Sequence, residues 1–129
     1  MDGSAKIESY RDLLVWQKAV DLAVATYRAT KDYPREEIYG LTSQTRRAAA
    51  SVAANIAEGY GRDSAGAYVQ FLKTAQGSLK EFETHIIIAS RVGILAPEHA
   101  QSMLLYAEEV GRMLRSLIRS IQNTTGDRQ

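Results

Sequence analysis

Apolar residues recur every three or four positions along most of the chain, which is the spacing of one face of an α-helix. The first such segment runs from about residue 13 to residue 30, and its apolar stripe consists of Leu13, Trp16, Val20, Ala23 and Tyr27. We expect this helix to end before Pro34, because the residue that precedes a proline avoids the helical region. Proline and the acidic Glu36 and Glu37 favour the start of a second helix at that point.

The second predicted helix continues to about Glu58, and Gly59 is expected to end it. Its stripe consists of Ile38, Leu41, Thr45, Ala48, Val52 and Asn55. A third helix should begin after a cap at Asp63 or Ser64 and extend to about Arg91. Its stripe consists of Tyr68, Phe71 or Leu72, Ala75, Leu79, Phe82 and Ile86. Gly77 interrupts this helix at a cost of roughly 1 kcal/mol, so we expect close packing there as compensation.

The fourth predicted helix opens at Pro97 and reaches about Ile121. Its apolar face is wider than one bundle seam needs and consists of Met103, Tyr106, Val110, Met113, Leu114, Leu117, Ile118 and Ile121. The apolar side chains beyond those that one seam needs face either another subunit or a broad core. Four helices with short links favour an all-α, antiparallel up-down-up-down four-helix bundle. We expect one domain over residues 1–129, with flexible ends at 1–9 and 123–129.

Composition agrees with one ordinary soluble domain, since the 129 residues are 45% hydrophobic. The absence of cysteine excludes disulfides and thiolate sites and favours a reducing compartment, so we expect a cytoplasmic protein. No signal peptide or run of about 20 apolar residues is present, so no membrane association is expected. A formal charge of +1 is too balanced to indicate nucleic-acid binding by itself.

Catalytic motifs are missing from this sequence. A carboxylate-bridged metal site in a helical bundle needs histidines three residues after glutamates, and neither His85 nor His99 has that spacing. Phosphate-binding loops and the Gly-x-Ser-x-Gly nucleophile motif are also absent. We therefore expect no enzyme activity, no cofactor and no metal.

A polar pair near the end of the second helix interrupts an otherwise apolar face. Asn55 and Glu58 are three residues apart and lie one above the other. We expect both to be largely buried and hydrogen-bonded, with Arg62, Lys80 or Ser78 as candidate partners, so that they fix helix register. A ligand pocket lined by Asn55 and Glu58 is the alternative.

Arginines form a second group of candidate functional residues. Arg46, Arg47 and Arg62 lie in or just after the second helix. Three more lie at spacings of three and four on the fourth helix: Arg112, Arg115 and Arg119. Such stripes contact nucleic-acid phosphates with salt-sensitive affinity, or else pair with neighbouring acids such as Glu108 and Glu109. Both interpretations stay open.

Three stretches carry a family resemblance: Tyr10-Arg11-Asp12-Leu13 with Trp16, the run from Tyr39 to Gly59, and Ala75-Gln76-Gly77-Ser78-Leu79-Lys80-Glu81. Over nearly its whole length the chain resembles the bacterial four-helix-bundle family linked to 23S rRNA intervening sequences. The resemblance implies a ring-like homopentamer, genes often inside large-subunit rRNA insertions, and no demonstrated reaction. The chain is also distantly similar to the accessory subunit of diversity-generating retroelements, which serves a reverse transcriptase and its RNA. Within the family signature, Asn55, Glu58, Ser78 and Glu81 are interpreted as a structural polar motif.

Two hypotheses about function follow. In the first, the protein is a homo-oligomer whose six arginines contact RNA. In the second, it is an assembly scaffold or accessory subunit whose apolar helix faces bind another protein without direct nucleic-acid binding.

Overall fold

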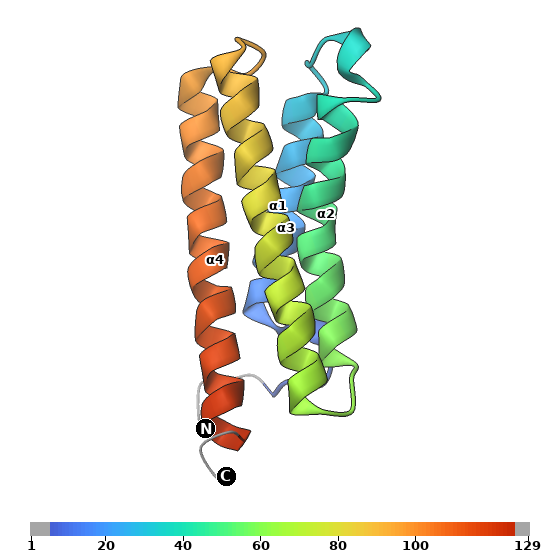
Figure 1. The fold of residues 1–129 in the computed structure, drawn as a ribbon, viewed down its shortest axis with the longest axis vertical. Helices are drawn as coiled ribbons and strands as arrows, with labels where there is room; N and C mark the ends of the chain where they lie inside the picture. Colours follow the sequence, from blue (N-terminus) through green and yellow to red (C-terminus); the bar gives the residue numbers. More distant parts are fainter. Residues whose placement is uncertain (1–5, 126–129) are drawn as a thin grey trace.

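Four long helices make up most of the computed structural model, which describes residues 6–125. They are α1 (Leu14–Thr30), α2 (Leu41–Tyr60), α3 (Ala65–Arg91) and α4 (Pro97–Thr125). Two short 3-10 helices, η1 (Tyr10–Asp12) and η2 (Arg35–Glu37), precede α1 and α2. Consecutive long helices run in opposite directions (Figure 1). The described residues contain no strand, so the all-α fold is confirmed.

All four helices contribute to one hydrophobic core. Each helix packs against its two neighbours, while α1 and α3, and likewise α2 and α4, lie diagonally and have no Cα atoms within 8 Å of each other in residues 6–125. The innermost side chains include one from each helix, and Leu22, Ile56, Phe82 and Leu114 are at most 1% exposed. A four-helix bundle with a shared core is the result.

The buried face of α1 differs from the predicted stripe. The side chains that enter the core are Val15, Ala19, Leu22, Thr26 and Ala29. Tyr27, by contrast, is 47% exposed, and the other members of the predicted stripe only flank the core. Burial of Thr26 is tolerated because its hydroxyl donates to the Leu22 carbonyl at 2.7 Å. The expectation was wrong because small and hydroxyl side chains form the innermost stripe.

The beginning of α2 also differs from the prediction. Pro34 precedes only η2, and α2 begins seven residues later at Leu41. Gly40 has a non-helical backbone (φ −108°, ψ −111°), and the Glu37 carboxylate accepts the Leu41 N–H at 3.1 Å. The intervening Tyr39 is 92% exposed. A continuous helix from Pro34 would have had no core contact there to stabilise it.

Two glycines have roles opposite to those predicted. Gly59 does not end α2, because the helix continues to Tyr60 and Gly59 is buried inside it. A Cβ atom at Gly59 would lie 2.7 Å from the Phe71 Cβ, so its hydrogen side chain permits the close approach of α2 and α3. Gly77, for which we expected close packing, is exposed and has no atom within 4 Å of an added Cβ.

The ends of α3 agree with the prediction. Its N-cap is Ser64, whose hydroxyl accepts the Ala67 N–H at 3.1 Å. At the other end Gly93 has φ 82°, and the Ile94 N–H bonds the Ala89 carbonyl at 2.9 Å. This is a Schellman motif, which needs a residue that tolerates positive φ.

Helix α4 begins at Pro97 as predicted but continues past Ile121 to Thr125. The predicted flexible ends, 1–9 and 123–129, lie partly outside the described residues. Within the described part, the Ser9 side chain caps η1.

Candidate nucleic-acid interface

A small hydrogen-bonded network joins the middle of α2 to α3. The Ser51 and Ser78 hydroxyls are 2.9 Å apart, and Asn55 Nδ2 donates to both the carbonyl and the hydroxyl of Ser51 at 2.9 Å. All three residues are half-buried. The network ties the register of α2 to that of α3.

The two glutamates of the predicted polar motif lie outside this network. Glu58 pairs with Arg62 at 2.9 Å and has a side chain that is 56% exposed, so the expectation of a buried Glu58 was wrong. The reason is that Gly59, its neighbour, occupies the position of closest contact with α3. Glu81 is 62% exposed and lies 3.8 Å from His85. Asn55 and Ser78 therefore share one network, whereas Glu58 and Glu81 belong to the surface.

His85 has both ring nitrogens buried without a hydrogen-bond partner. Its nearest charge is the Glu81 carboxylate. Residues 6–125 contain no group of three or more His, Cys, Asp or Glu side chains placed to hold a metal ion.

The six arginines occupy three separate regions rather than one surface. Arg46 lies between α1 and α2, where its Nε donates to the Thr30 hydroxyl at 2.8 Å and its guanidinium stacks 4.7 Å from the Tyr27 ring centroid. Arg62, at the other end of α2, combines its Glu58 ion pair with a contact 4.6 Å from the centre of the Phe71 ring. Arg46 and Arg62 thus serve contacts within the bundle.

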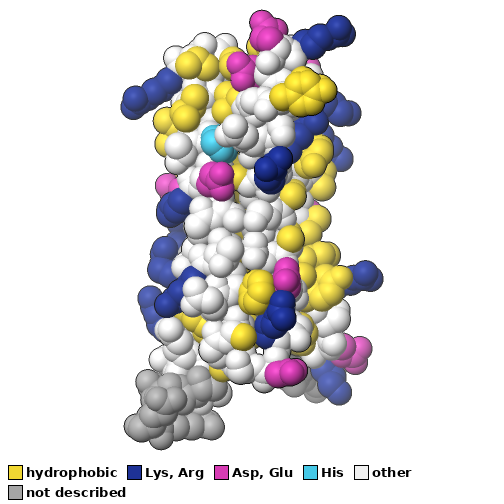
Figure 2. Space-filling model, turned by 45° about the vertical axis from the view of Figure 1, so that its right-hand side comes forward, with side chains coloured by type: hydrophobic (Ala, Val, Ile, Leu, Met, Phe, Trp, Pro, Cys, Tyr) yellow, Lys and Arg dark blue, Asp and Glu magenta, His cyan; other side chains and the backbone are white. Residues whose placement is uncertain are grey.

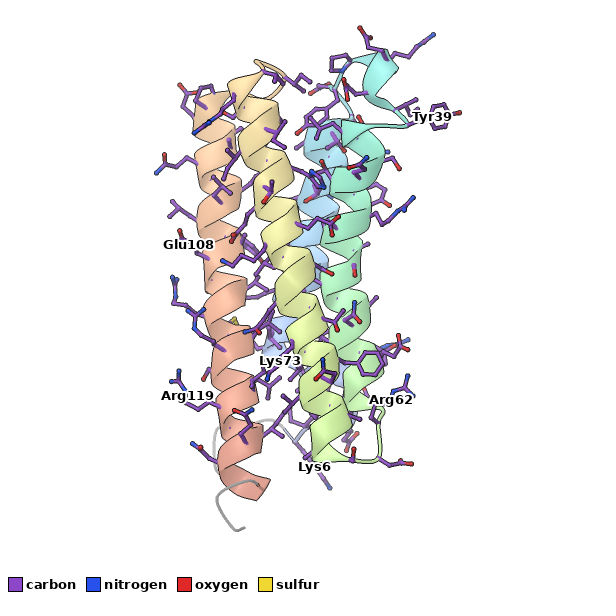
Figure 3. The ribbon with its side chains drawn as sticks, viewed as in Figure 1. Lys6, Tyr39, Arg62, Lys73, Glu108 and Arg119 are labelled. Carbon is purple, nitrogen blue, oxygen red and sulfur yellow. The ribbon has the colours of Figure 1, made fainter. Side chains whose placement is uncertain are left out.

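The α4 arginines form the most open cationic surface. Arg112, Arg115 and Arg119 are all exposed, and together they extend about 10 Å along the helix. Arg112 lies 4.0 Å from Glu108, whereas Arg115 and Arg119 have no ion pair within residues 6–125. Figure 3 places Arg119 on the outer side of α4, across the bundle from Arg62. In Figure 2, Lys and Arg side chains follow one another along one long edge of the molecule.

A second cationic surface lies beside the turn that leads into α2. Two adjoining hollows of about 450 and 340 Å³ share Ile38, Thr42 and Arg46 as lining residues. The larger also contains Arg47 and Tyr39. Sequence reasoning included Arg46 and Arg47 but missed Tyr39, which falls on no helical stripe. The sequence could have indicated its exposure, because Tyr39 lies directly before Gly40 and outside the periodic apolar pattern.

An apolar groove of about 450 Å³ runs between α1 and α2. Its lining residues are Val20, Ala23, Val24, Tyr27, Arg28, Lys31, Ala50 and Ala53. On α4 the wide apolar face is mostly used within the bundle, since Met113 and Leu117 pack against the core. No helix within residues 6–125 is long and apolar enough to span a bilayer.

These features define a helical bundle with two cationic surfaces. The chain matches the model of the family described as 23S rRNA-intervening sequence protein over residues 11–116, and it belongs to that family. The family resemblance predicted from the sequence is thereby confirmed. A similar solved structure is that of a protein of unknown function from the S23 ribosomal protein family of Bacteroides thetaiotaomicron, with 22% identity and a TM-score of 0.74. The similarity covers 81% of this chain and 98% of that one and concerns the fold alone. The comparison with curated proteins gave no match.

Proposed function

We propose that this member of the 23S rRNA-intervening sequence protein family is a non-enzymatic, self-associating cytoplasmic bundle that contacts RNA phosphates through Arg112, Arg115 and Arg119. The observation that carries the proposal is the charge of α4. From Val110 to Thr125 the helix has these three arginines and no acidic residue. An exposed stripe of this kind attracts polyanions, because each neutralised phosphate releases condensed counterions.

The remaining predicted arginines contribute less to this surface. Arg62 is ion-paired with Glu58 within the bundle, and Arg46 lies on α2, diagonally across the bundle from α4. Arg47 is exposed but lies on α2, diagonally across the bundle from α4. The α4 stripe is therefore the part of the predicted set that is best suited to a phosphate backbone.

Self-association would multiply this stripe. The apolar groove between α1 and α2 supports it, because Val24 and Tyr27 are 42% and 47% exposed beside each other on one helix. The family resemblance favours a homopentamer, and the stripe lies on α4, away from α2. Five copies of a three-arginine stripe would bind RNA far more strongly than one.

Measurement of the affinity for a structured RNA tests this proposal. A variant with Arg112, Arg115 and Arg119 changed to Gln should bind a labelled RNA hairpin at least tenfold more weakly in fluorescence anisotropy. The matched control changes Arg11, Lys73 and Arg91 to Gln, which removes the same charge from exposed positions on other elements that do not line the α1–α2 groove. Equal affinities of the two variants would contradict the proposal.

A protein-binding scaffold is the second candidate, and the apolar groove between α1 and α2 is the observation that favours it. A stable protein partner recovered without nucleic acid, and lost on Val24→Asp but not on the α4 changes, would support the scaffold instead.

A further inference from the structure

The turn between η2 and α2 carries a surface that the fold itself does not use. We name it the Tyr39 surface and define it by the side chains that line the two hollows and carry exposed aromatic rings or positive charge: Tyr27, Lys31, Arg35, Tyr39, Arg46 and Arg47. No acidic residue lines either hollow. Four cations without an opposing carboxylate, beside exposed aromatic rings, distinguish this surface from an ordinary solvated helix face.

Tyr39 is the most exposed large hydrophobic side chain among the described residues, at 92%. Figure 3 shows it projecting outward from the turn. Its backbone is nevertheless held in place, because the next residue, Gly40, donates its N–H to the Glu37 carbonyl at 3.0 Å. An aromatic ring on an anchored backbone presents both faces to a ligand, and base stacking on such a ring is sequence-tolerant.

Arg46 provides a fixed cation between the two hollows. Its hydrogen bonds to Thr30 and to the Tyr27 carbonyl use part of a guanidinium that has five N–H donors, and its stacking on Tyr27 fixes the plane of the group. A cation held in this way loses little conformational entropy when an anion binds.

The acids nearest in sequence are Asp32, Glu36 and Glu37. None of them lines either hollow, and the Glu37 carboxylate is oriented by the Leu41 N–H, which it accepts at 3.1 Å. Arg47, exposed and adjacent in sequence to Arg46, has no ion pair within residues 6–125. The charge that remains is positive and suits a phosphate next to the Tyr39 ring.

From these observations we infer that the Tyr39 surface binds a single-stranded RNA segment, with one unstacked base on the Tyr39 ring and the flanking phosphates on Arg46 and Arg47. A duplex does not suit the site, because its bases are already stacked inside the helix. A protein partner is less suitable, because the lining around the Tyr39 ring is mainly cationic and hydroxylated. The inference rests on the proposed contact with RNA but uses a different surface, since Tyr39 and Arg119 lie at opposite ends of the bundle (Figure 3).

The test uses the whole chain and a fluorescein-labelled single-stranded octaribonucleotide in anisotropy titrations. Tyr39→Ala should weaken binding by roughly 5- to 150-fold, the range found when one stacking aromatic ring is removed. Tyr39→Phe should bind as the wild type does, because the ring rather than the hydroxyl is needed. Leu105→Ala, an equally simple truncation of an exposed apolar side chain on α4, should have no effect.

A spectroscopic measurement reports the contact directly. Tyr39→Trp should show fluorescence quenching when the octaribonucleotide is added, whereas the native Trp16, half-buried near the start of α1, should not change in the wild-type protein. Unchanged fluorescence of the Tyr39→Trp variant at saturating RNA would overturn the inference.

The outcomes separate this inference from the proposed function. In one outcome, the α4 changes weaken hairpin binding, but the Tyr39→Ala variant binds the octaribonucleotide as tightly as the wild type does. This result would overturn the Tyr39 site and leave the proposed function standing. In another outcome, Tyr39→Ala weakens binding of the octaribonucleotide, but the α4 changes have no effect on hairpin affinity. This result would support the Tyr39 site and overturn the α4 proposal. If Tyr39→Ala altered self-association in light scattering but not RNA affinity, the surface would be a protein interface and the inference would be wrong.

Discussion

Replacement of Gly59 by alanine tests the packing of α2 against α3, because the same replacement is available at a position with opposite surroundings. Gly59 lies where the two helices approach most closely, and Gly77 lies on α3 in open solvent. Gly77 is in the interior of α3, where alanine improves the helix propensity by roughly 1 kcal/mol, and Gly59 is the second-last residue of α2, where that gain is smaller. The difference in stability between the two variants is therefore dominated by the cost of the added methyl group at Gly59.

At Gly59 the new Cβ atom would lie 2.7 Å from the Phe71 Cβ and 3.2 Å from both a ring carbon and the carbonyl oxygen of Tyr68. The Phe71 Cβ and the Tyr68 carbonyl cannot rotate away, so the helices must separate by several tenths of an ångström. Overpacking of this kind costs typically about 1–3 kcal/mol. Gly59→Ala should therefore be less stable than Gly77→Ala by about that amount, whereas Gly77→Ala should be more stable than the wild type by about 0.5–1 kcal/mol.

Urea unfolding followed by helical circular dichroism, at one fixed protein concentration, measures both differences. The concentration must be constant because self-association contributes to apparent stability. If Gly59→Ala were as stable as Gly77→Ala, the close approach of α2 and α3 at Gly59 would be refuted.

Three further predictions concern a tyrosine, a hydrogen bond and assembly. Burial raises the pKa of Tyr33, whose hydroxyl is buried without a partner. The unfolded chain therefore loses this proton first as the pH rises through about 10, and stability falls. Tyr33→Phe should raise the free energy of unfolding by about 1 kcal/mol at pH 7. In urea titrations the variant should also lose less stability than the wild type as the pH rises above about 10. An unchanged dependence of stability on pH would contradict this. A double-mutant cycle of Ser51→Ala and Ser78→Ala should give a coupling of about 0.5–1.5 kcal/mol, and zero coupling would contradict the network. Light scattering after nuclease treatment should show an oligomer, and a monomer would contradict self-association.

Sequence periodicity was sufficient for the number of long helices and for both ends of α3. Ser64 and Gly93 have side-chain and backbone requirements that few other residues meet at a helix end, so their positions were informative. The beginning of α2 was less predictable, because Pro34 is compatible with both an α-helix and the short η2. Only the absence of core contacts at Tyr39 distinguishes a short 3-10 helix from a continuous α-helix at this point.

Which face of a helix is buried depends on its neighbours rather than on its own sequence. On α1 two stripes compete, and the structure buries the one containing Thr26, whose hydroxyl is satisfied by its own helix. Glu58 was misplaced for a similar reason, since nothing in its local sequence shows that Gly59 contacts α3. For the candidate interface, the α4 stripe followed from spacing alone. The Tyr39 surface did not, because it brings together α1, η2 and α2.

The salt dependence of RNA binding tests the central claim, that α4 contacts phosphates, most directly. Three neutralised phosphates should make log K fall with log salt with a slope of about −2 to −3 for each bound stripe. The variant with Gln at positions 112, 115 and 119 should lose most of that slope, whereas the control variant with Gln at positions 11, 73 and 91 should keep it. An identical slope in the wild type and the α4 variant would contradict the account.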